Sequence, residues 1–227
     1  MPAAALLLAG AAVPAPAQGP GGTEAGESLL SAPHSTVGSV IRLSGMLAGS
    51  GADRRAEIQL QGRAGVWLKV ASGAVARDGR FQIAWRAPRS GRFLARAVDK
   101  GAGKSGLAAT PTTVITVHNK TQATWYDQAG TTSACGVKLR KKTLGVAHKT
   151  LPCGTLLDFT FRGKSITVPV IDRGPYGAGI SYDFTIEVAR RLGFVNTGRG
   201  AVDVLRSGTK LTQLSAAQLP GAIPAAS

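Results

Sequence analysis

Short segments of alternating apolar and polar residues, repeated along most of the chain, limit the possible folds more than any other feature. Such alternation is typical of β-strands with one buried face. The segments are separated by turn-forming pairs such as Asp78-Gly79 and Ser90-Gly91, which tolerate the positive φ of tight turns. With 30 glycines, 12 prolines and 5% aromatic residues, the composition favours strands and turns over long helices. The sequence therefore predicts a mainly β fold and excludes an all-α bundle.

Residues 35–118 are predicted to form a β-sandwich. The motifs Leu43-Ser44-Gly45, Trp67-Leu68-Lys69-Val70 and Asp78-Gly79-Arg80-Phe81 resemble those of bacterial immunoglobulin-like wall-protein domains. This resemblance implies an N-terminal immunoglobulin-like β-sandwich. Because large aromatic side chains are usually buried, its core is expected to contain Trp67, Phe81, Trp85 and Phe93. Its predicted strands are Val37 to Leu43, Ala56 to Leu60, Val66 to Val70, Arg80 to Trp85, Arg92 to Val98 and Thr113 to Val117.

The first residues are typical of an export signal. Ala3 to Val13 is uncharged and apolar, and Ala15-Pro16-Ala17 follows it, so residues 1–17 are predicted to be a signal peptide. A basic segment normally comes first, so we expect the signal to start upstream of Met1; an Ala-rich leader is the alternative. Residues 18–34 are rich in small residues and are predicted to be a flexible leader. The protein is thus expected to be secreted, without a transmembrane segment.

The charge balance is strongly basic. The chain has 27 Lys and Arg against 12 Asp and Glu, a formal net charge of +15. These charges are spread along the chain and lack the concentrated basic helix or interleaved aromatic residues of nucleic-acid readers, so nucleic acid is not expected as a partner. For an exported protein, anionic cell-wall polymers are the nearest partners of opposite charge.

The cysteine count leaves two interpretations. Cys135 and Cys153 are the two cysteines of the chain, and in an oxidising compartment such a pair indicates one disulfide. Zinc is the alternative, because His148 lies between them. Structural zinc sites usually have four ligands, and no fourth ligand is suitably spaced.

Residues 121–207 are predicted to form a second unit, a small closed barrel of short strands with one helix. Ile186, Ala189 and Leu192 have helical spacing, Thr185 can cap the start of the helix and Gly193 can end it. The predicted strands are Ala123 to Tyr126, Leu144 to His148, Leu156 to Phe161, Ser165 to Ile171 and Ala201 to Leu205. Residues 208–227 are predicted to be a disordered tail.

Ordered sequence blocks in this unit identify a family. The blocks are Ala123-Thr124-Trp125-Tyr126, Val146 through Thr155, Ile171-Asp172-Arg173-Gly174-Pro175-Tyr176 and Tyr182-Asp183-Phe184-Thr185. Together they resemble the rare lipoprotein A-like double-psi β-barrel. The resemblance implies a six-stranded double-psi barrel, and its best-known members are septal-ring lytic transglycosylases that cleave peptidoglycan glycan strands. The cysteine pair resembles the actinobacterial-type branch of this family.

The candidate catalytic residues are Asp172 and His148. A lytic transglycosylase needs one group that protonates the glycosidic oxygen and then accepts the proton of the muramoyl 6-hydroxyl. Asp172 follows an apolar strand and is expected to emerge into a loop, where it can do both. Proton donation requires a raised pKa, which Arg173 would lower if its guanidinium pointed inward. In the resembled family the histidine of this block shares the cleft, so His148 is expected to orient the carboxyl or to stabilise charge on the sugar. The alternative is a structural histidine that ties the loops of the barrel together.

The candidate substrate-binding residues are Tyr126, Arg173, Tyr176 and Asp183, and the two tyrosines can offer ring faces for sugar stacking. Asp183 corresponds to the aspartate before the helix in the resembled family, and its main role is expected to be structural, because its carboxylate can accept amide hydrogen bonds near the helix start. One position departs from the family. Many of these enzymes have Ser-Gly-Glu where this chain has Cys135-Gly136-Val137, so a carboxylate of the cleft is missing.

Two functions remain after this comparison. The first is a secreted or wall-associated lytic transglycosylase that cleaves the MurNAc-GlcNAc bond and leaves 1,6-anhydro-muramoyl ends. The alternative is a non-catalytic, expansin-like module that binds or loosens the wall. The expected partners are peptidoglycan glycan strands, with anionic wall polymers as further candidates. The sequence has no phosphate-binding glycine loop and no metal-binding His pair, so neither a cofactor nor a metal is predicted.

Overall fold

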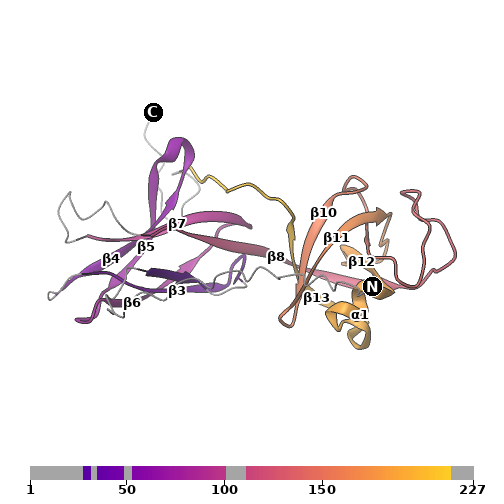
Figure 1. The fold of residues 1–227 in the computed structure, drawn as a ribbon, viewed down its shortest axis with the longest axis horizontal. Coiled ribbons are helices and arrows are strands. Elements are labelled where there is room, and N and C mark those ends of the chain that lie inside the picture. Colours follow the sequence, from indigo (N-terminus) through magenta and orange to yellow (C-terminus); the bar gives the residue numbers. More distant parts are fainter. Residues whose placement is uncertain (1–27, 32–34, 49–52, 101–110, 216–227) are drawn as a thin grey trace, which may run out of the picture.

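The computed structural model describes residues 28–31, 35–48, 53–100 and 111–215. Within these ranges the chain is mainly β-strand with one α-helix, as the sequence predicts. It forms two lobes joined end to end, an N-terminal lobe and a barrel (Figure 1). The predicted signal peptide, residues 1–17, lies outside the described residues. No helix within the described ranges has the length and apolar character needed to cross a membrane.

The N-terminal lobe is built from two sheets around one apolar core. In one sheet the strand order is β1-β3-β6, and in the other β8, β7, β4 and β5 are neighbours, with β2 beside β8. Burial alternates along the strands, most regularly in β6, where every second side chain faces the core. The lobe is thus a β-sandwich; its assignment as immunoglobulin-like stays a prediction. Its elements are β1 (Ser28–Ser31), β2 (Ser35–Thr36), β3 (Val40–Met46), β4 (Arg55–Gln61), η1 (Arg63–Gly65), β5 (Trp67–Ala74), β6 (Arg80–Arg86) and β7 (Gly91–Asp99).

Three of the four aromatic residues expected in this core are there. Phe81, Trp85 and Phe93 are buried, and the rings of Trp85 and Phe93 meet edge to face. Trp67 is different, because it lies half-buried outside the core, with the guanidinium carbon of Arg96 4.1 Å from its ring centroid. The reason is its register: Leu68, the next residue on β5, packs against the core, so Trp67 faces the other side of the sheet.

Six strands close the barrel. Around the ring, β8 is followed by β12, β9, β11, β10 and β13, and β13 pairs with β8 again. The β8–β12 and β9–β11 pairs are parallel, and the other pairs are antiparallel. Closure leaves the barrel without free sheet edges, and it agrees with the predicted six-stranded barrel. Its strands are β8 (Thr113–Tyr126), β9 (Val146–His148), β10 (Leu156–Phe161), β11 (Lys164–Asp172), β12 (Tyr182–Thr185) and β13 (Gly200–Arg206).

The barrel encloses an aromatic core, which the helix α1 (Ile186–Leu192) covers. Phe159, Phe184 and Phe194 are fully buried and pack mostly edge to face with their neighbours. Gly193 ends the helix in a left-handed conformation, as predicted. Thr185 precedes the helix but does not cap it, because its hydroxyl donates to the Thr143 carbonyl at 2.7 Å. A short 3-10 helix, η3 (Val195–Thr197), leads into β13.

Strand β8 belongs to both lobes. The sequence predicts two strands here, at residues 113–117 and 123–126, but the structure forms a single strand over Thr113–Tyr126. Its first part pairs with β7 and β2 of the sandwich, and its second part pairs with β13 and β12 of the barrel. The two lobes are therefore connected by continuous strand rather than by a linker (Figure 1).

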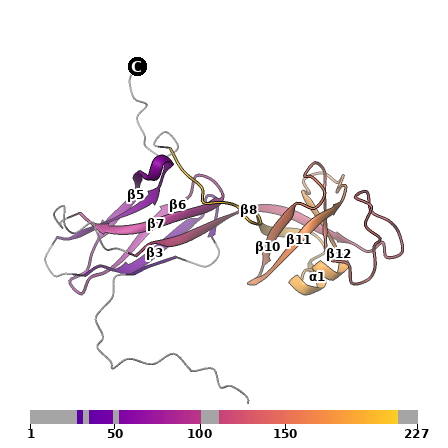
Figure 2. The same cartoon turned by 45° about the horizontal axis from the view of Figure 1, so that its top comes forward.

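A second connection runs back from the barrel to the sandwich. Residues 207–215, which we call the strap, leave β13 and lie along the N-terminal lobe (Figure 2). The Arg92 amide donates to the Thr212 hydroxyl at 3.2 Å, and a side chain at Gly91 would collide with this threonine. Leu214 has 0% exposed surface and belongs to the sandwich core. The first part of the predicted disordered tail is thus ordered, because Leu214 gains a buried position; residues 216–227 lie outside the described residues.

We expect Leu214→Ala to destabilise the N-terminal lobe by about 2–5 kcal/mol, because it leaves a cavity in a fully packed core. Leu211→Ala is the matched control, since Leu211 lies on the same strap but is 44% exposed. It should change stability by no more than about 0.5 kcal/mol. Denaturant unfolding followed by tryptophan fluorescence measures both. Equal losses at the two positions would contradict a role for Leu214 in the core.

Candidate active site

A cleft of about 470 Å³ opens at one end of the barrel, where several strands end. Tyr126 is the last residue of β8, Asp172 is the last residue of β11 and Asp183 lies in β12. In the parallel β8–β12 pair, Asp183 is paired with Thr124, two residues before Tyr126. The lining residues are Tyr126, Gln128, Ala147, Asp172, Arg173, Gly174, Pro175, Tyr176, Gly177 and Asp183.

The structure brings together most of the residues expected at the site. All four expected substrate-binding residues and the catalytic candidate Asp172 line this cleft. His148 is not among the lining residues. Val137, which the resemblance places where many family members have a glutamate, does not line the cleft either, and its amide donates to the Ser133 hydroxyl at 3.1 Å. Asp172 and Asp183 are therefore the two carboxyl groups of the cleft among the described residues.

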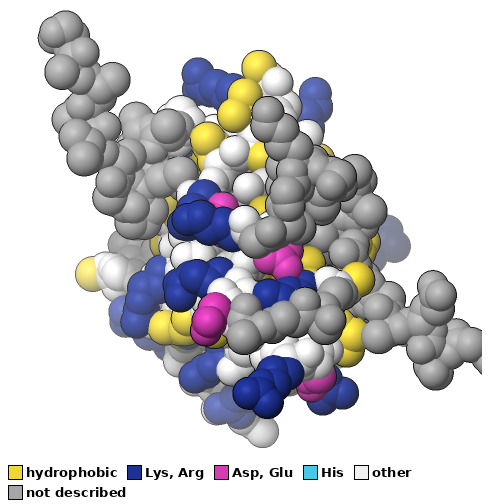
Figure 3. All heavy atoms as spheres, turned by 90° about the vertical axis from the view of Figure 1, so that its left-hand side faces the viewer, with side chains coloured by type: hydrophobic (Ala, Val, Ile, Leu, Met, Phe, Trp, Pro, Cys, Tyr) yellow, Lys and Arg dark blue, Asp and Glu magenta, His cyan; other side chains and the backbone are white. Residues whose placement is uncertain are grey.

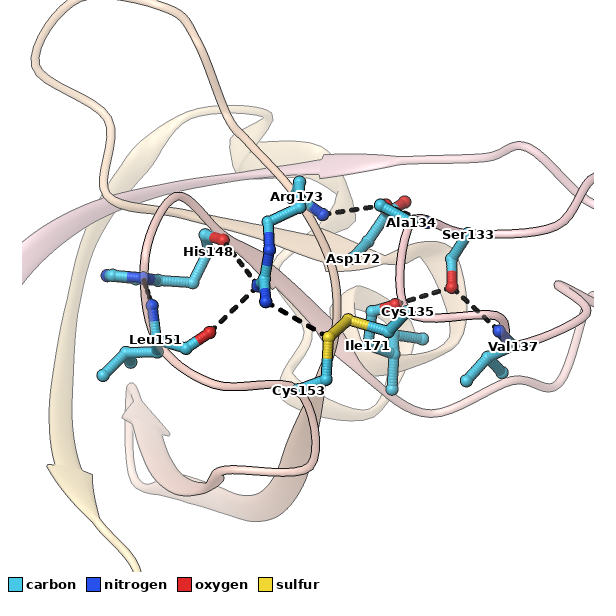
Figure 4. Close-up of a disulfide and its surroundings, with 10 residues drawn as sticks. All are labelled: Ser133, Ala134, Cys135, Val137, His148, Leu151, Cys153, Ile171, Asp172 and Arg173. Atoms are coloured by element: carbon cyan, nitrogen blue, oxygen red, sulfur yellow. Dashed lines mark hydrogen bonds between the residues drawn. A yellow bond between two sulfur atoms is a disulfide. The ribbon is translucent and has the colours of Figure 1, made fainter.

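The Asp172 carboxyl is fixed by backbone groups. Its Oδ1 atom accepts hydrogen bonds from the amides of Ala134, at 2.9 Å, and of Arg173, at 2.8 Å (Figure 4). The hydroxyl of Ser133 holds the same loop by donating to the Ile171 carbonyl at 2.6 Å. Because Oδ1 already accepts two donors, Oδ2 is the oxygen that is available to exchange a proton with a bound molecule.

Asp183 and Tyr126 create a cleft in which additional negative charge is unfavourable. Burial raises the pKa of Asp183 above its ordinary value, and the charge of Asp172 raises it further, although a 2.6 Å hydrogen bond from the Thr124 hydroxyl opposes the shift. Burial raises the pKa of Tyr126, and the charges of both carboxylates and an interaction of its hydroxyl with the Asp172 side chain raise it further. The buried hydroxyl makes no hydrogen bond of good geometry among the described residues, so its contact with Asp172 is poorly aligned. This phenol can therefore turn its proton toward a bound molecule.

His148 has a local role in the structure. Its Nδ1 atom accepts hydrogen bonds from the amides of Thr150, at 3.1 Å, and Leu151, at 2.9 Å, and its ring packs against Tyr182 at 4.9 Å. The imidazole points away from Asp172 (Figure 4). Burial, followed by the positive charges of Arg173 and Lys149, lowers the pKa of His148. The neutral ring therefore caps the loop after β9.

The Arg173 side chain points toward that same loop. Its Nη1 atom donates to the carbonyls of Leu151, at 2.9 Å, and His148, at 3.3 Å, and Nη2 approaches the sulfur of Cys153 at 3.2 Å (Figure 4). The sequence leaves the direction of the Arg173 guanidinium open, and the structure shows that it points toward the loop after β9. Tyr176, by contrast, is 82% exposed at the edge of the cleft, where its ring is accessible to a ligand.

Cys135 and Cys153 form a disulfide, as predicted. Both sulfur atoms are used in that bond, and the His148 Nδ1 atom is occupied by backbone amides, so the zinc alternative is wrong. Elsewhere among the described residues, no group of three or more potential ligands could hold a metal ion.

Two contributors to the site were not singled out from the sequence. The Ala134 amide is a backbone donor, and nothing in the sequence indicates where a backbone group will point. Thr124 lies within a recognised sequence block, and the parallel pairing of β8 with β12 sets it directly beside Asp183. A pairing scheme for the family barrel could have found Thr124 but not Ala134.

We expect the stability contributed by His148 to be lost in mild acid. Its pKa is lowered on folding, so the unfolded chain, with an ordinary value of about 6.5, binds this proton more tightly. The contribution is complete above that pH and decreases below it. His148→Asn keeps a side-chain acceptor that does not titrate, so this variant should lose less thermal stability than the parent between pH 7 and pH 5. His148→Leu should be less stable at both values, and parallel pH profiles for the parent and His148→Asn would contradict the prediction.

Asp183 should behave in the opposite sense. Because its pKa is raised on folding from an ordinary value of 3.8, the folded protein binds this proton more tightly, and the contribution of Asp183 to stability decreases as pH rises above that value. Asp183→Asn can still accept from the Thr124 hydroxyl, so its melting temperature at pH 7 should equal or exceed that of the parent. The advantage should disappear near pH 3. Asp158→Asn is the matched control, since Asp158 also accepts a hydrogen bond from a threonine hydroxyl, that of Thr167, at 2.6 Å, but on an exposed surface. An equal gain in melting temperature for Asp158→Asn would contradict this explanation.

Comparison with known proteins agrees with this geometry. Residues 118–204 match the family described as lytic transglycolase. The "Probable endolytic peptidoglycan transglycosylase RlpA" of Aquifex aeolicus is 30% identical over 110 residues, which are 47% of this chain and 46% of that protein. The "Endolytic peptidoglycan transglycosylase RlpA" of Neisseria meningitidis serogroup A is 32% identical over 105 residues, 44% of each chain. The protein of the same name from Pseudomonas aeruginosa is 32% identical over 113 residues, 43% of this chain and 33% of that protein.

The matched part is less than half the length of each of these relatives. Among solved structures, the "Streptomyces papain inhibitor (SPI)" matches 38% of this chain and 94% of its own, with 23% identity and a TM-score of 0.32. That score is too low to bear on the fold, which follows instead from the closed ring of strand pairs. Together with the family match and the RlpA relatives, this ring shows that residues 118–204 form a double-psi β-barrel domain of the rare lipoprotein A type.

Proposed function

We propose that the protein is a secreted or wall-associated lytic transglycosylase that cleaves the MurNAc-GlcNAc bond of peptidoglycan. The observation that carries the proposal is the arrangement of Asp172, whose Oδ1 is held by two backbone amides while Oδ2 remains available in the cleft. The names of the relatives support the same substrate class. The disulfide is consistent with an exported protein, because such bonds persist in oxidising compartments.

In this mechanism Asp172 acts first as an acid and then as a base. Its Oδ2 proton moves to the glycosidic oxygen, the C1–O4 bond breaks, and positive charge develops on the muramoyl ring. The 6-hydroxyl of that ring then forms a bond to C1 and returns its proton to the Asp172 carboxylate. The product is a 1,6-anhydro-muramoyl end, and no water is consumed. A single carboxyl thus suffices, whereas a glycoside hydrolase uses two.

The other cleft residues would hold the sugar. The Tyr126 hydroxyl, which interacts with the Asp172 side chain without a well-aligned hydrogen bond, can donate to a sugar oxygen, and exposed Tyr176 offers a ring face for stacking. Asp183, with its raised pKa, lies beside Tyr126 and can donate or accept a hydrogen bond to the glycan. His148 would assist Asp172 through the loop that it caps rather than by contact with substrate.

The second candidate function is an expansin-like module that holds glycan without cutting it. Val137 favours it, because this residue supplies no carboxylate to the cleft. Positive charge also favours wall binding, since Lys and Arg side chains dominate the end face of the N-terminal lobe (Figure 3). An anionic wall polymer would be attracted to that face at low ionic strength. Exposed basic residues of this lobe are Arg42, Arg55, Arg63, Lys69, Arg77, Arg80, Arg86, Arg89, Arg92 and Lys100.

Product analysis decides between the two functions. The protein is incubated with purified peptidoglycan and with peptide-free glycan strands, and the soluble products are identified by mass spectrometry. We expect anhydro-muramoyl ends from the parent and a decrease of about 10²- to 10⁴-fold in Asp172→Asn, because the proton donor is lost. Asp158→Asn is the control, and it should retain parental activity.

Two other outcomes would contradict the proposal. Reducing ends without anhydro rings would identify a hydrolase. If the parent and Asp172→Asn both sediment with the wall but neither releases fragments, the binding module is the function.

A further inference from the structure

Two loops flank the end of β11, and each is attached there by its own set of hydrogen bonds. The first loop, residues 133–137, is attached through the Ser133 hydroxyl on the Ile171 carbonyl and the Ala134 amide on Asp172 Oδ1. The Ser133 hydroxyl also accepts the Val137 amide, and the Ser133 amide donates to the Val137 carbonyl, so this loop is a closed turn. The Asp172 carboxyl therefore has its position set by a loop that is distant in sequence.

The second loop, residues 148–154, is attached through the Arg173 guanidinium. Three contacts of that guanidinium go to the loop: the carbonyls of His148 and Leu151 and the sulfur of Cys153. At the other end of the loop, the Gly154 amide donates to the Val170 carbonyl at 2.7 Å. An arginine is well suited here, because a planar guanidinium can donate to several acceptors at once.

The Cys135–Cys153 disulfide joins the two loops to each other. The contacts form a closed circuit (Figure 4). It runs from Asp172 to the first loop, across the disulfide to the second loop, and from there to the side chain of Arg173, which directly follows Asp172 in the chain. Without the disulfide, the Ala134 loop is held to β11 through the Ser133 hydroxyl and Ala134 alone; without the Arg173 contacts, the second loop keeps its attachment at Gly154 but loses the one beside Asp172. The circuit matters for chemistry because Ala134 and Arg173 supply the two amides that hold Oδ1 and keep Oδ2 available.

We propose that Arg173 is a positioning residue rather than a substrate ligand, and that, with the disulfide, it keeps the Ala134 amide on the Asp172 carboxyl. Through this circuit, the geometry of the acid/base group depends on the oxidation state of Cys135 and Cys153. The inference rests on the proposed function where it concerns catalysis, but the circuit itself can be tested without activity. Cys153 is exposed, so a reductant can reach the bond.

The structural test uses the Ala134 amide as a reporter. An amide that donates to a carboxylate changes its NMR shift as that carboxylate is protonated, and it exchanges slowly with solvent. In the full-length parent, we expect the ¹H–¹⁵N signal of Ala134 to follow the titration of Asp172. In Arg173→Gln, and equally in the parent treated with dithiothreitol, that response should be lost and hydrogen exchange at Ala134 should accelerate about tenfold or more.

Matched variants separate positioning from general damage. Arg162→Gln removes an arginine from the β10–β11 turn, outside the residues that line the cleft, and it should leave the Ala134 signal unchanged. Arg173→Lys keeps the charge but can serve fewer acceptors, so its exchange rate should lie between those of the parent and Arg173→Gln. In every variant the amides of α1 must keep their parental shifts, which shows that the barrel is folded.

Activity provides the second measurement. With glycan as substrate, Arg173→Gln and reduction should each lower kcat about ten- to hundredfold with less than a twofold change in KM, because the carboxyl is misplaced while the binding residues remain. Reduction of Arg173→Gln should cause little further loss, since both changes open the same circuit.

The two proposals fail in different ways. An inactive parent whose Ala134 amide behaves as expected would overturn the lytic transglycosylase and leave the circuit intact. A parental Ala134 titration and exchange rate in Arg173→Gln would overturn the positioning role even in an active enzyme. A large rise in KM with unchanged kcat would likewise overturn it, because Arg173 would then be a substrate ligand.

Discussion

The hydrogen-bond ladder along β8 is the constraint on which the rest of the structure depends. Its first part pairs with β7 and, at its end, with β2, and its second part pairs with β13 and then with β12. A strand that is paired in both lobes cannot slide without breaking ladders in both, because a shift of one residue exchanges its two faces. The register of β8 therefore fixes Tyr126 at the cleft and, across the parallel pair, sets Thr124 beside Asp183.

The side chains of the candidate site are held in place mainly by backbone groups. Amides hold Asp172, amides cap His148 and carbonyls receive Arg173. Such groups carry no net charge, so they orient the Asp172 carboxyl without adding another ion to a cleft that already disfavours negative charge. The side chains that face the cleft can then be few, and the role proposed for Asp172 does not require a carboxylate at Val137.

The sequence predicts strands well where burial alternates over five or more residues, as in β4, β6 and β7. It fails where the local signal is short or where distant segments decide the outcome. β12 has only four residues with Asp183 among them, so it lacks a detectable period, and its strand conformation comes from pairing with β8 and β9. At the site, the five cleft residues follow from family motifs, but the direction of the Arg173 guanidinium does not, because loop carbonyls determine it.

The strap makes the N-terminal lobe dependent on the last described part of the chain. Leu214 fills the sandwich core, and hydrogen bonds from Arg92 and Arg89 to the strap span 120 and 124 residues. Contacts between residues so far apart in the sequence form late, because a long loop must close before they contribute, and they make folding slower. A chain that emerges from a ribosome or an export channel with its N-terminus first cannot complete its first lobe until the barrel has also emerged. The order of the two lobes in the sequence is therefore not their order of completion, and a cut at the end of the sandwich would separate that lobe from part of its own core.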